Sequence, residues 1–303
     1  MSTSQSQPMP DAGAFSADAG LTTLRSAKDG YAGDVRAVDR TVASPPGARG
    51  ELEPGAYAIP VGSIAASGSN RVVEGLYRGA EIILALIGLI VGLPIMLLEA
   101  VLVRWDSPGP ALFFHIRVAR SAILPGRALV RRTDLRVPGD DIDIDRLYHV
   151  PQTFRFVKFR TMYHDSRARF PELYRYEYTA DEFRKVCFKN EDDPRITRLG
   201  RWLRKLTIDE LPNLWCVLTG DMRLVGPRPE HPAIIRYYTP EETVKFTVKP
   251  GITGLAQING RGLLNQGETI GWDLEYVRTR TVWLDIKIIF KTLWLVIVRR
   301  GAF

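Results

Sequence analysis

Two adjacent carboxylates, Asp209 and Glu210, follow closely on a concentration of positive charge. The basic residues just upstream are Arg198, Arg201, Arg204 and Lys205. A carboxylate held among cations stays ionised and can attack phosphorus, while the cations hold the phosphate oxygens. A second carboxylate can hold Mg²⁺, which prefers oxygen ligands and often bridges to substrate phosphates. These residue types at this spacing indicate a phosphoryl-transfer site.

The element that positions this pair is expected to be a helix starting at Thr207. Thr207-Ile208-Asp209-Glu210 fits a Thr-x-x-Glu capping box. The residues that follow at helical spacing form one apolar face: Leu211, Leu214, Trp215 and Leu218. Asp209 falls opposite this face, so it is expected to point away from the core, near helix N–H groups that favour anions. The structural alternative is that Glu210 only caps the helix and Asp209 only pairs with Lys205.

Further cations lie in segments that can present them to the same phosphate. Residues 154–162 alternate as in a strand, so Lys158 and Arg160 are expected on one face, within reach of one phosphate. The alternative is an edge strand with solvated charges. Gly226-Pro227-Arg228-Pro229 fixes the backbone and presents a guanidinium, and the Gly-rich turn Lys249–Arg261 ends in another arginine.

An apolar segment suits a membrane. Ile82–Leu98 contains no charge and would extend about 25 Å as a helix, slightly short of a hydrocarbon core of about 30 Å. Pro94 lies within it and removes a backbone hydrogen bond. Because arginines flank both ends, the segment is predicted to enter the membrane and return to the same side. A kinked single-pass helix is the alternative.

The C-terminal run Val282–Arg300 combines tryptophans, lysines and aliphatic residues, but its longest apolar stretch is too short to span a membrane. A helix lying in the membrane interface is favoured, and a core helix is the alternative.

The rest of the chain divides by composition. Residues 1–70 are rich in Gly, Pro, Ser and Ala, carry a net negative charge and are expected to be a disordered tail. Residues 71–303 carry nine more basic than acidic side chains, which suits an anionic partner. Residues 120–150 are expected to be irregular and rich in solvated charge. The two cysteines, Cys187 and Cys216, are expected to be buried apolar residues in a reducing compartment.

Together these segments resemble the bacterial sugar transferases, the monotopic polyprenyl-phosphate phosphoglycosyl transferases. The matching segments occur in family order over roughly residues 75–300: the DSPGP turn, KFRTM, DPRITRLGRWLRKLTIDELPNL, GDMRLVGPRPE, KPGITGLAQINGR and WLDIKIIFKTLW. No one of them is specific, but jointly they are.

The resemblance implies transfer of a sugar phosphate from a UDP-sugar to polyprenyl phosphate, with release of UMP. It implies that Asp209 is the nucleophile, that Glu210 together with Asp209 holds Mg²⁺, and that Arg204 binds phosphate. Arg261 matches another family element, while Lys158, Arg160 and Arg228 are the further phosphate- or substrate-binding candidates. The family's apolar segment is re-entrant and broken at a proline like Pro94.

The resemblance also gives expectations for architecture and place. The fold is expected to be α+β and mainly helical, with a tail at 1–70, a re-entrant helix and turn at 71–110, and a catalytic domain at 111–303. Residues 120–153 form a segment longer than the usual family connection. The expected location is the bacterial inner membrane, with the catalytic domain on the cytoplasmic face, in contact with anionic lipid and not with nucleic acid. Formation of a homo-oligomer is left open.

The sequence departs from the family pattern at several positions. His115 stands where the family usually has Gln, Ala119 where it has Gly, and Asn213 where Gln is common. Two other function classes fit parts of the sequence. A catalytically inactive membrane scaffold of polysaccharide assembly is disfavoured by the intact Asp-Glu pair, and a basic nucleic-acid-binding membrane protein would bind with strong salt dependence and turn over no nucleotide sugar.

Overall fold

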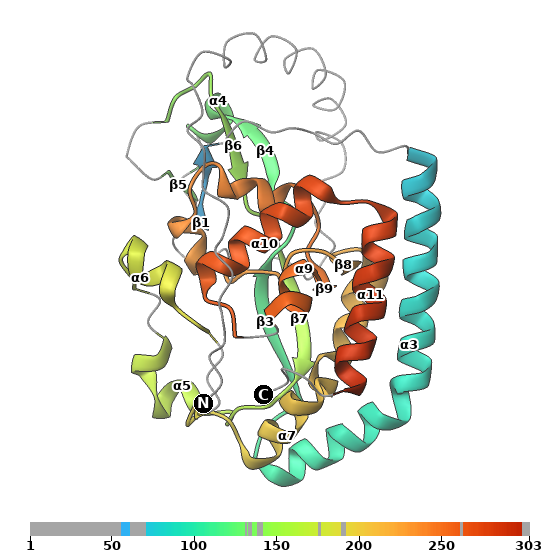
Figure 1. Ribbon diagram of the computed structural model, residues 1–303. Coiled ribbons are helices and arrows are strands. Elements are labelled where there is room, and N and C mark those ends of the chain that lie inside the picture. The colour runs from blue at the N-terminus through green and yellow to red at the C-terminus, as the bar shows by residue number, and fades with distance from the viewer. Residues whose placement is uncertain are drawn as a thin grey trace, which may run out of the picture. The chain divides into compact units, whose positions relative to one another are not determined.

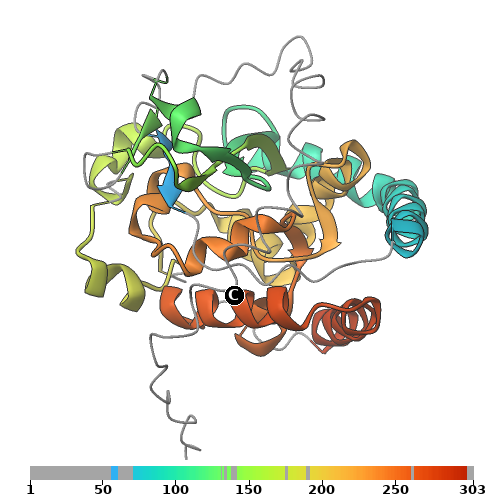
Figure 2. The ribbon, with the colours of Figure 1, turned by 90° about the horizontal axis from the view of Figure 1, so that it is seen from above.

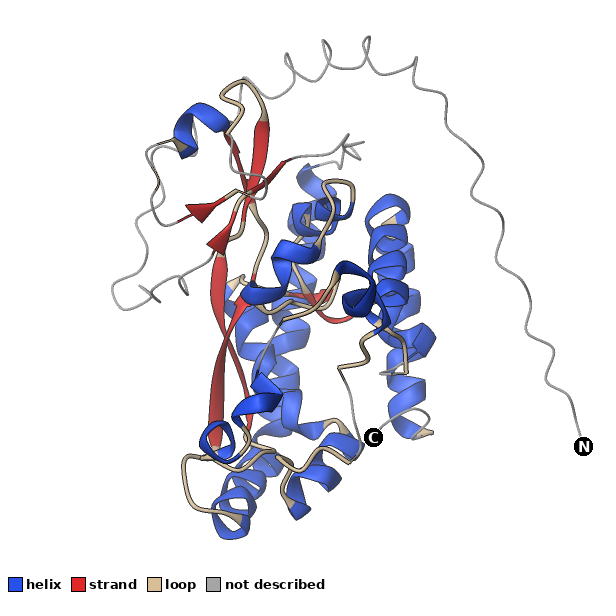
Figure 3. Ribbon diagram, turned by 90° about the vertical axis from the view of Figure 1, so that its left-hand side faces the viewer, coloured by secondary structure: helices blue, strands red, loops and turns tan. Residues whose placement is uncertain are grey.

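Helices predominate over short strands in the part of the chain that the computed structural model describes (Figures 1 and 3). The described residues are 56–60, 71–130, 132, 135–137, 142–174, 177–188, 192–260 and 263–298. All of them belong to one unit, Gly50–Phe303. This agrees with the expected α+β, mainly helical fold.

Helix α3 (Arg71–Asp106) contains the apolar segment and extends beyond it at both ends. Among the described helices it alone is long and apolar enough to cross a membrane, with a mean hydropathy of 2.6 over a window of which 17% is buried. Pro94 lies inside it, and the ribbon changes direction along its length (Figure 1), as expected where proline removes a backbone hydrogen bond. Figures 1 and 2 agree that α3 lies at the periphery of these elements.

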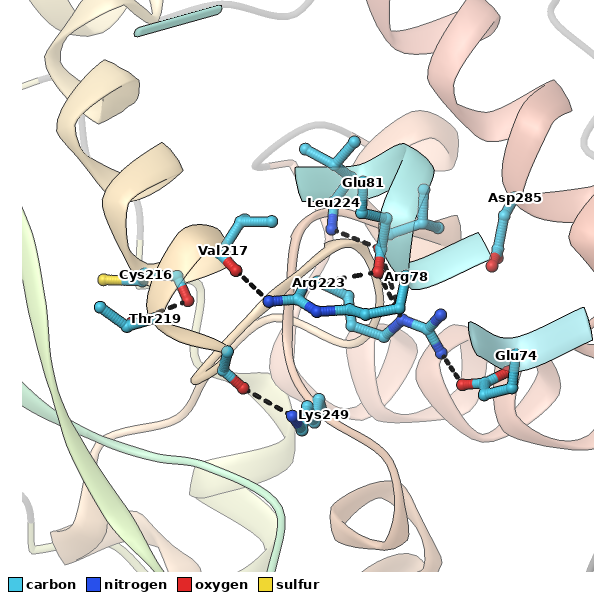
Figure 4. Close-up of polar contacts among 12 residues, drawn as sticks. Glu74, Arg78, Glu81, Cys216, Val217, Thr219, Arg223, Leu224, Lys249 and Asp285 are labelled. Atoms are coloured by element: carbon cyan, nitrogen blue, oxygen red, sulfur yellow. Dashed lines mark hydrogen bonds and ion pairs between the residues drawn. The ribbon is translucent and has the colours of Figure 1, made fainter. Parts of the chain in front are cut away.

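Ion pairs hold the N-terminal half of α3 to the rest of the unit. The anchoring cluster consists of Glu74, Arg78, Glu81, Arg223 and Arg280 (Figure 4 shows all but Arg280). Arg223 contacts Glu74 at 2.5 Å and Glu81 at 3.1 Å. Arg78 also donates to the carbonyl oxygen of Val217 (Figure 4). The cluster joins α3 to a segment about 140 residues later in the chain.

A two-stranded antiparallel hairpin forms the centre of the site region. Strand β3 (Leu112–Val118) pairs with β7 (Thr153–Phe159), with Phe113 opposite Lys158 and His115 opposite Phe156. The strand predicted from the alternation of residues 154–162 is confirmed, and it ends at Phe159. Directly paired residues project to the same side of a sheet, so Phe113, His115, Arg117 and Lys158 share one face.

Three helical elements pack beside this hairpin and against α3: α7 (Arg198–Leu206), the 3₁₀ helix η3 (Ile208–Asn213) and α8 (Leu214–Thr219). The approach is closest at Gly88, where a Cβ would lie 2.9 Å from the side chain of Leu214. A Cβ on Gly92 would be in ordinary contact with Leu211, at 3.7 Å. The short parallel pair β8 (Arg223–Val225) and β9 (Gly251–Thr253) follows.

The remaining elements complete the core. They are α5 (Ser166–Arg169), η2 (Pro171–Tyr174), α6 (Ala180–Lys185), η4 (Pro232–Tyr237), η5 (Glu242–Thr247), α9 (Leu255–Gly260), α10 (Gln266–Thr279) and α11 (Val282–Ile297). A cluster around Phe183, Ile235, Phe246 and Ile270 joins several of them. Helix α11 appears where the C-terminal apolar run predicted a helix. Asp285 and Ile288 are buried in it, while its exposed side chains include Trp283, Phe290, Trp294 and Ile297.

Two expectations about the less regular segments are corrected. Within the predicted tail, Ala56–Tyr57 (β1) and Ile59–Pro60 (β2) form strands, and Ile59 is buried. The segment expected to be irregular contains β4 (Ala122–Pro125), α4 (Gly126–Leu129), β5 (Leu135–Arg136) and β6 (Leu147–Val150).

These two segments support each other: β1 pairs with β5, and β2 pairs with β6, which also pairs with β4. Pairing partners some 90 residues away supply the hydrogen bonds and apolar cover that local composition does not reveal.

Of the two cysteines, Cys216 is buried as expected, whereas Cys187 is exposed. Cys187 lies in the segment just after α6 ends at Lys185, at the surface of the described unit.

Candidate active site

Asp209 lies in η3 and is 5% exposed, so the expectation that it points away from the core is wrong. That expectation holds only where the apolar face of this segment packs on the protein core. Instead Leu211 and Leu214 lie against α3, and Trp215 is 59% exposed. Because the apolar face is turned toward the peripheral helix and the outside, the opposite face carries Asp209 into the protein interior.

The predicted capping box is also absent. Thr207 makes no side-chain cap hydrogen bond to this helical segment and has φ 59°, in the left-handed region. That conformation is unfavourable for a β-branched residue, with a cost of about 1–3 kcal/mol. It ends α7 and redirects the chain so that η3 begins immediately. Glu210, released from a capping role, accepts a hydrogen bond from Arg228 at 3.2 Å.

Three cations bear on Asp209: Lys158, Arg204 and Arg228. Burial raises the pKa of Asp209, and the neighbouring charge of Glu210 adds to the rise, while the three cations oppose it. A more basic carboxylate is a stronger nucleophile. No hydrogen bond or ion pair joins Asp209 to these cations within the described residues. The carboxylate and the cations can therefore each interact with a ligand.

Lys158 comes from β7 and Arg204 from α7. Burial lowers the pKa of Lys158 to about 8, with Asp209 partly offsetting the shift. The Arg204 Nε donates to the Thr161 hydroxyl at 2.9 Å. Helix α7 can approach this close because residue 200 is glycine: a Cβ there would lie 2.1 Å from the Thr161 carbonyl oxygen. The structure thus brings the two predicted phosphate-binding residues to the same carboxylate.

Arg160 occupies a different place from the one expected. It is 4% exposed, and its guanidinium donates to the carbonyl oxygens of Ser107, Pro108 and Pro110 at 2.7–2.8 Å. These groups form the end of α3 and the turn after it. The expectation that Lys158 and Arg160 reach one phosphate together does not fit this placement, because the donors of Arg160 are occupied by the backbone.

Arg228 is presented by the rigid Gly-Pro-Arg-Pro loop, and buried charges hold the loop from behind. The Pro229 carbonyl accepts from Arg117 at 3.3 Å. Lys245, 1% exposed, contacts Glu230 at 2.5 Å and Asp273 at 2.8 Å. The charge of Glu210 raises the pKa of Arg228, so this guanidinium stays positive beside the carboxylate pair.

Several residues near the site were not predicted as site residues, although His115 stood out as a departure from the family pattern. Arg117 and His115 alternate along β3 with the spacing of a strand face, a signal that could have singled them out. His231 follows the loop of Arg228, and its ring lies 4.9 Å from that of His115. Glu99 of α3 is 2% exposed, and the charged group that interacts with it electrostatically is Asp209. Its position could not be read locally, since 110 residues separate the two.

Two predicted features remain to be placed. Arg261 lies outside the described residues. No cluster of three or more His, Cys, Asp or Glu side chains able to hold a metal ion occurs in the described ranges. A Mg²⁺ ion can nevertheless be held by one or two carboxylates together with substrate phosphates. The repulsion between Asp209 and Glu210, which raises the Asp209 pKa, is what such a cation would relieve.

Comparison with known proteins assigns the family. Residues 144–299 match the bacterial sugar transferase family. The chain belongs to the bacterial sugar transferase family. This confirms the resemblance seen in the motifs and the expectation of a sugar transferase.

Individual relatives agree. The chain is 30% identical to the exopolysaccharide production protein ExoY of Sinorhizobium fredii (strain NBRC 101917 / NGR234), over 78% of this chain and 92% of that protein. It is 41% identical to a UDP-galactose-lipid carrier transferase of Erwinia amylovora over 50% of this chain and 31% of that protein. It is 36% identical to an undecaprenyl-phosphate glucose phosphotransferase of Komagataeibacter xylinus over 69% of this chain and 34% of that protein. The chain therefore spans nearly all of the first relative and about a third of the other two.

Proposed function

We propose that this sugar transferase moves a sugar 1-phosphate from a UDP-sugar to a polyprenyl phosphate such as undecaprenyl phosphate, releasing UMP. The observation that supports it most is a buried carboxylate, Asp209, surrounded by Lys158, Arg204 and Arg228 with no ion pair to any of them among the described residues. Such a site offers a nucleophile and binding groups for phosphate oxygens together. The names of two relatives, one a UDP-galactose-lipid carrier transferase and one an undecaprenyl-phosphate glucose phosphotransferase, support the donor and acceptor.

The proposed reaction proceeds in two displacements at one phosphorus. An oxygen of Asp209 attacks the β-phosphorus of the UDP-sugar. The bond between the β-phosphorus and the oxygen that bridges it to the α-phosphorus breaks, so UMP leaves with the bonding electrons. The acceptor phosphate then attacks the same phosphorus, and the bond to Asp209 breaks to return the carboxylate. The products are the polyprenyl diphosphate sugar and UMP. The transferred phosphate group is negatively charged in both displacements. Stabilisation of that charge by fixed cations is therefore the main catalytic contribution.

Each nearby cation has a distinct position relative to this phosphorus. Lys158 lies on the hairpin face and Arg204 on α7, both bearing directly on Asp209. Arg228 already holds Glu210. We assign Lys158 and Arg204 to the transferred phosphate, and Arg228 to the neighbouring phosphate of the donor, because its guanidinium already contacts the second carboxylate, Glu210.

Mg²⁺ is proposed to bind through Glu210, with Asp209 adjacent and substrate phosphates completing the coordination. The ion would neutralise phosphate charge when bound. Glu210 would then exchange part of its contact with Arg228 for the ion, leaving the guanidinium to the donor.

We also propose that α3 is re-entrant, so that both ends lie on the cytoplasmic side of the inner membrane. The supporting features are Pro94 within the helix, the change of direction and its exposed apolar side chains. The exposed tryptophans of α11, with Lys287 over Trp283, suit a position at anionic headgroups. Cysteines introduced near residues 60 and 110 should both react with an impermeant reagent only from the cytosolic side. Labelling from opposite sides would refute the re-entrant arrangement.

The likeness to an exopolysaccharide production protein supports a role at the first membrane step of exopolysaccharide or related glycan assembly. The experiment that tests the activity measures UMP release from a panel of UDP-sugars with undecaprenyl phosphate in detergent or nanodiscs. The wild type should release UMP with at least one sugar, and Asp209→Asn should lose at least about a thousandfold. Full activity of the mutant would refute the nucleophile, and no release with any sugar would favour an inactive scaffold.

A further inference from the structure

Two histidines meet beside the charged part of the site. His115 projects from β3 and His231 follows directly on Glu230, and their ring centroids lie 4.9 Å apart with the rings tilted by 43°. His115 shares its strand face with Lys158, which pairs with the residue two positions earlier, Phe113. His115 and Lys158 are therefore diagonal neighbours across the two strands, a position that places residues about 7–8 Å apart.

Both imidazoles are uncharged near neutral pH. Burial lowers the pKa of His115 to about 2, helped by the charge of Arg117, and lowers that of His231 to about 4. The Nδ1 of His231 accepts from the backbone N–H of Ala233 at 3.2 Å, which leaves the proton on Nε2. A patch of neutral donors and acceptors thus adjoins the cationic patch formed by Lys158, Arg204 and Arg228.

The side chain of His115 is only partly buried and makes no hydrogen bond to another described residue, although its neighbours are charged or aromatic. A neutral imidazole has one N–H donor and one nitrogen acceptor. Both can be offered to a ligand. Neutral groups of this kind suit hydroxyls, whereas phosphate oxygens are better held by the cations next to them.

The covalent connectivity of the UDP-sugar indicates which of its hydroxyls lie near His115. In a UDP-sugar the sugar is bonded through one oxygen to the β-phosphorus that Asp209 would attack. The uracil is separated from that phosphorus by the α-phosphate and the ribose. His115, diagonal to Lys158 on the same face, is near enough to the transferred phosphate to reach the sugar bonded directly to it, whereas the uracil lies farther along the donor.

We infer that His115 hydrogen-bonds hydroxyls of the transferred sugar and contributes to the choice of sugar, with His231 supporting its ring. The inference rests on the proposed function, since it assigns part of that same donor site. Relatives differ in the sugar that their names carry, galactose in one and glucose in another, while the uridine diphosphate part of the donor would be shared.

The test compares wild type, His115→Ala and His115→Gln in UMP release from UDP-galactose, UDP-glucose and their N-acetylamino counterparts. Loss of a hydrogen bond to a sugar hydroxyl should lower kcat/KM about tenfold for the preferred sugar and less for a sugar that does not use it. The ratio of kcat/KM between the best and second-best donors should thus fall severalfold in His115→Ala. Glutamine, which also donates and accepts but with different reach, should alter the order of preference.

Two controls separate this role from a structural one. UDP lacks the transferred sugar, so its inhibition constant should stay within about twofold of the wild-type value in both variants. Thermal unfolding should be unchanged. His164→Ala, a change at an exposed histidine outside the site, should keep the wild-type preference. An unchanged ratio of donors in His115→Ala would overturn the inference, and so would an equal loss for all sugars with weaker UDP inhibition. Absence of UMP release by the wild type with every donor would instead overturn the proposed function, and this inference with it.

Discussion

Helix α3 carries two buried glutamates on one face, and they differ in every contact. Glu81 and Glu99 are each 2% exposed. Glu81 accepts from Arg223 and from the backbone N–H of Leu224, at 3.1 and 2.9 Å. The carboxylate oxygens of Glu99 have no hydrogen-bond partner among the described residues. The first lies in the anchoring cluster, and the second faces Asp209 in the candidate active site.

The difference separates charges that hold the fold from charges available for chemistry. In the anchoring cluster, buried ion pairs fasten a peripheral helix to the catalytic body. Around Asp209, the carboxylates and cations are close enough to interact, yet only Glu210 and Arg228 form an ion pair in the described structure. An unpaired buried charge costs free energy, and a substrate phosphate or a cation can recover that cost on binding.

The largest effect is expected from breaking the anchoring cluster. Arg223→Leu removes the nearer cation from buried Glu81 and leaves it with Arg78 at 3.6 Å, which should lower the free energy of unfolding by about 3–5 kcal/mol. Thermal unfolding in detergent measures this, and Glu81→Leu/Arg223→Leu should recover part of the loss because no buried charge is stranded. A loss below about 1 kcal/mol for the single change would mean that the cluster does not fasten α3.

The next effect concerns a charge on the catalytic side. Lys158→Met should lower kcat/KM for UMP release about a hundredfold, as removal of one group that stabilises transition-state charge does. Lys158 loses its proton as pH rises through its lowered pKa of about 8, so wild-type kcat/KM should fall above that pH. Lys158→Arg, which keeps its charge, should shift the alkaline limb upward. A wild-type rate that stays flat to high pH would contradict this role.

The smallest effect is expected at the unpaired glutamate. Glu99→Leu removes a buried carboxylate that makes no hydrogen bond in the described structure, so unfolding free energy should stay equal or rise by about 1–3 kcal/mol. Glu81→Leu is the matched control on the same helix face and should destabilise. A loss at Glu99 as large as that at Glu81 would show that the two ends of α3 do not differ as described.

Local sequence patterns predicted where helices and strands form, but predicted less well which other elements pack against them. Alternation located β7, and continuous apolarity located α3, because both patterns depend on residues close in sequence. The orientation of Asp209 was wrong because the helical wheel gives the direction of an apolar face and not what lies against it. Here that is α3, which begins more than 130 residues earlier.

The same reason explains the other failures. Arg160 donates to carbonyl oxygens of residues some 50 positions away. Strand β2 pairs with β6, about 90 residues later in the chain. Glu81 and Glu99 have the same local sequence context, since each is one glutamate at an end of an uncharged run. That context does not reveal that the first is paired and the second is not. Only the packed structure distinguishes a residue fastened by arginine from one facing the site.

The most direct measurement of the central claim is the intact mass of the protein after incubation with a UDP-sugar and Mg²⁺ in the absence of polyprenyl phosphate. The account predicts that wild type gains the mass of one sugar phosphate, that fragmentation places it on Asp209, and that adding undecaprenyl phosphate removes it. Asp209→Asn should gain nothing. Turnover by the wild type with no such adduct under rapid quenching, or an adduct on another residue, would contradict the account.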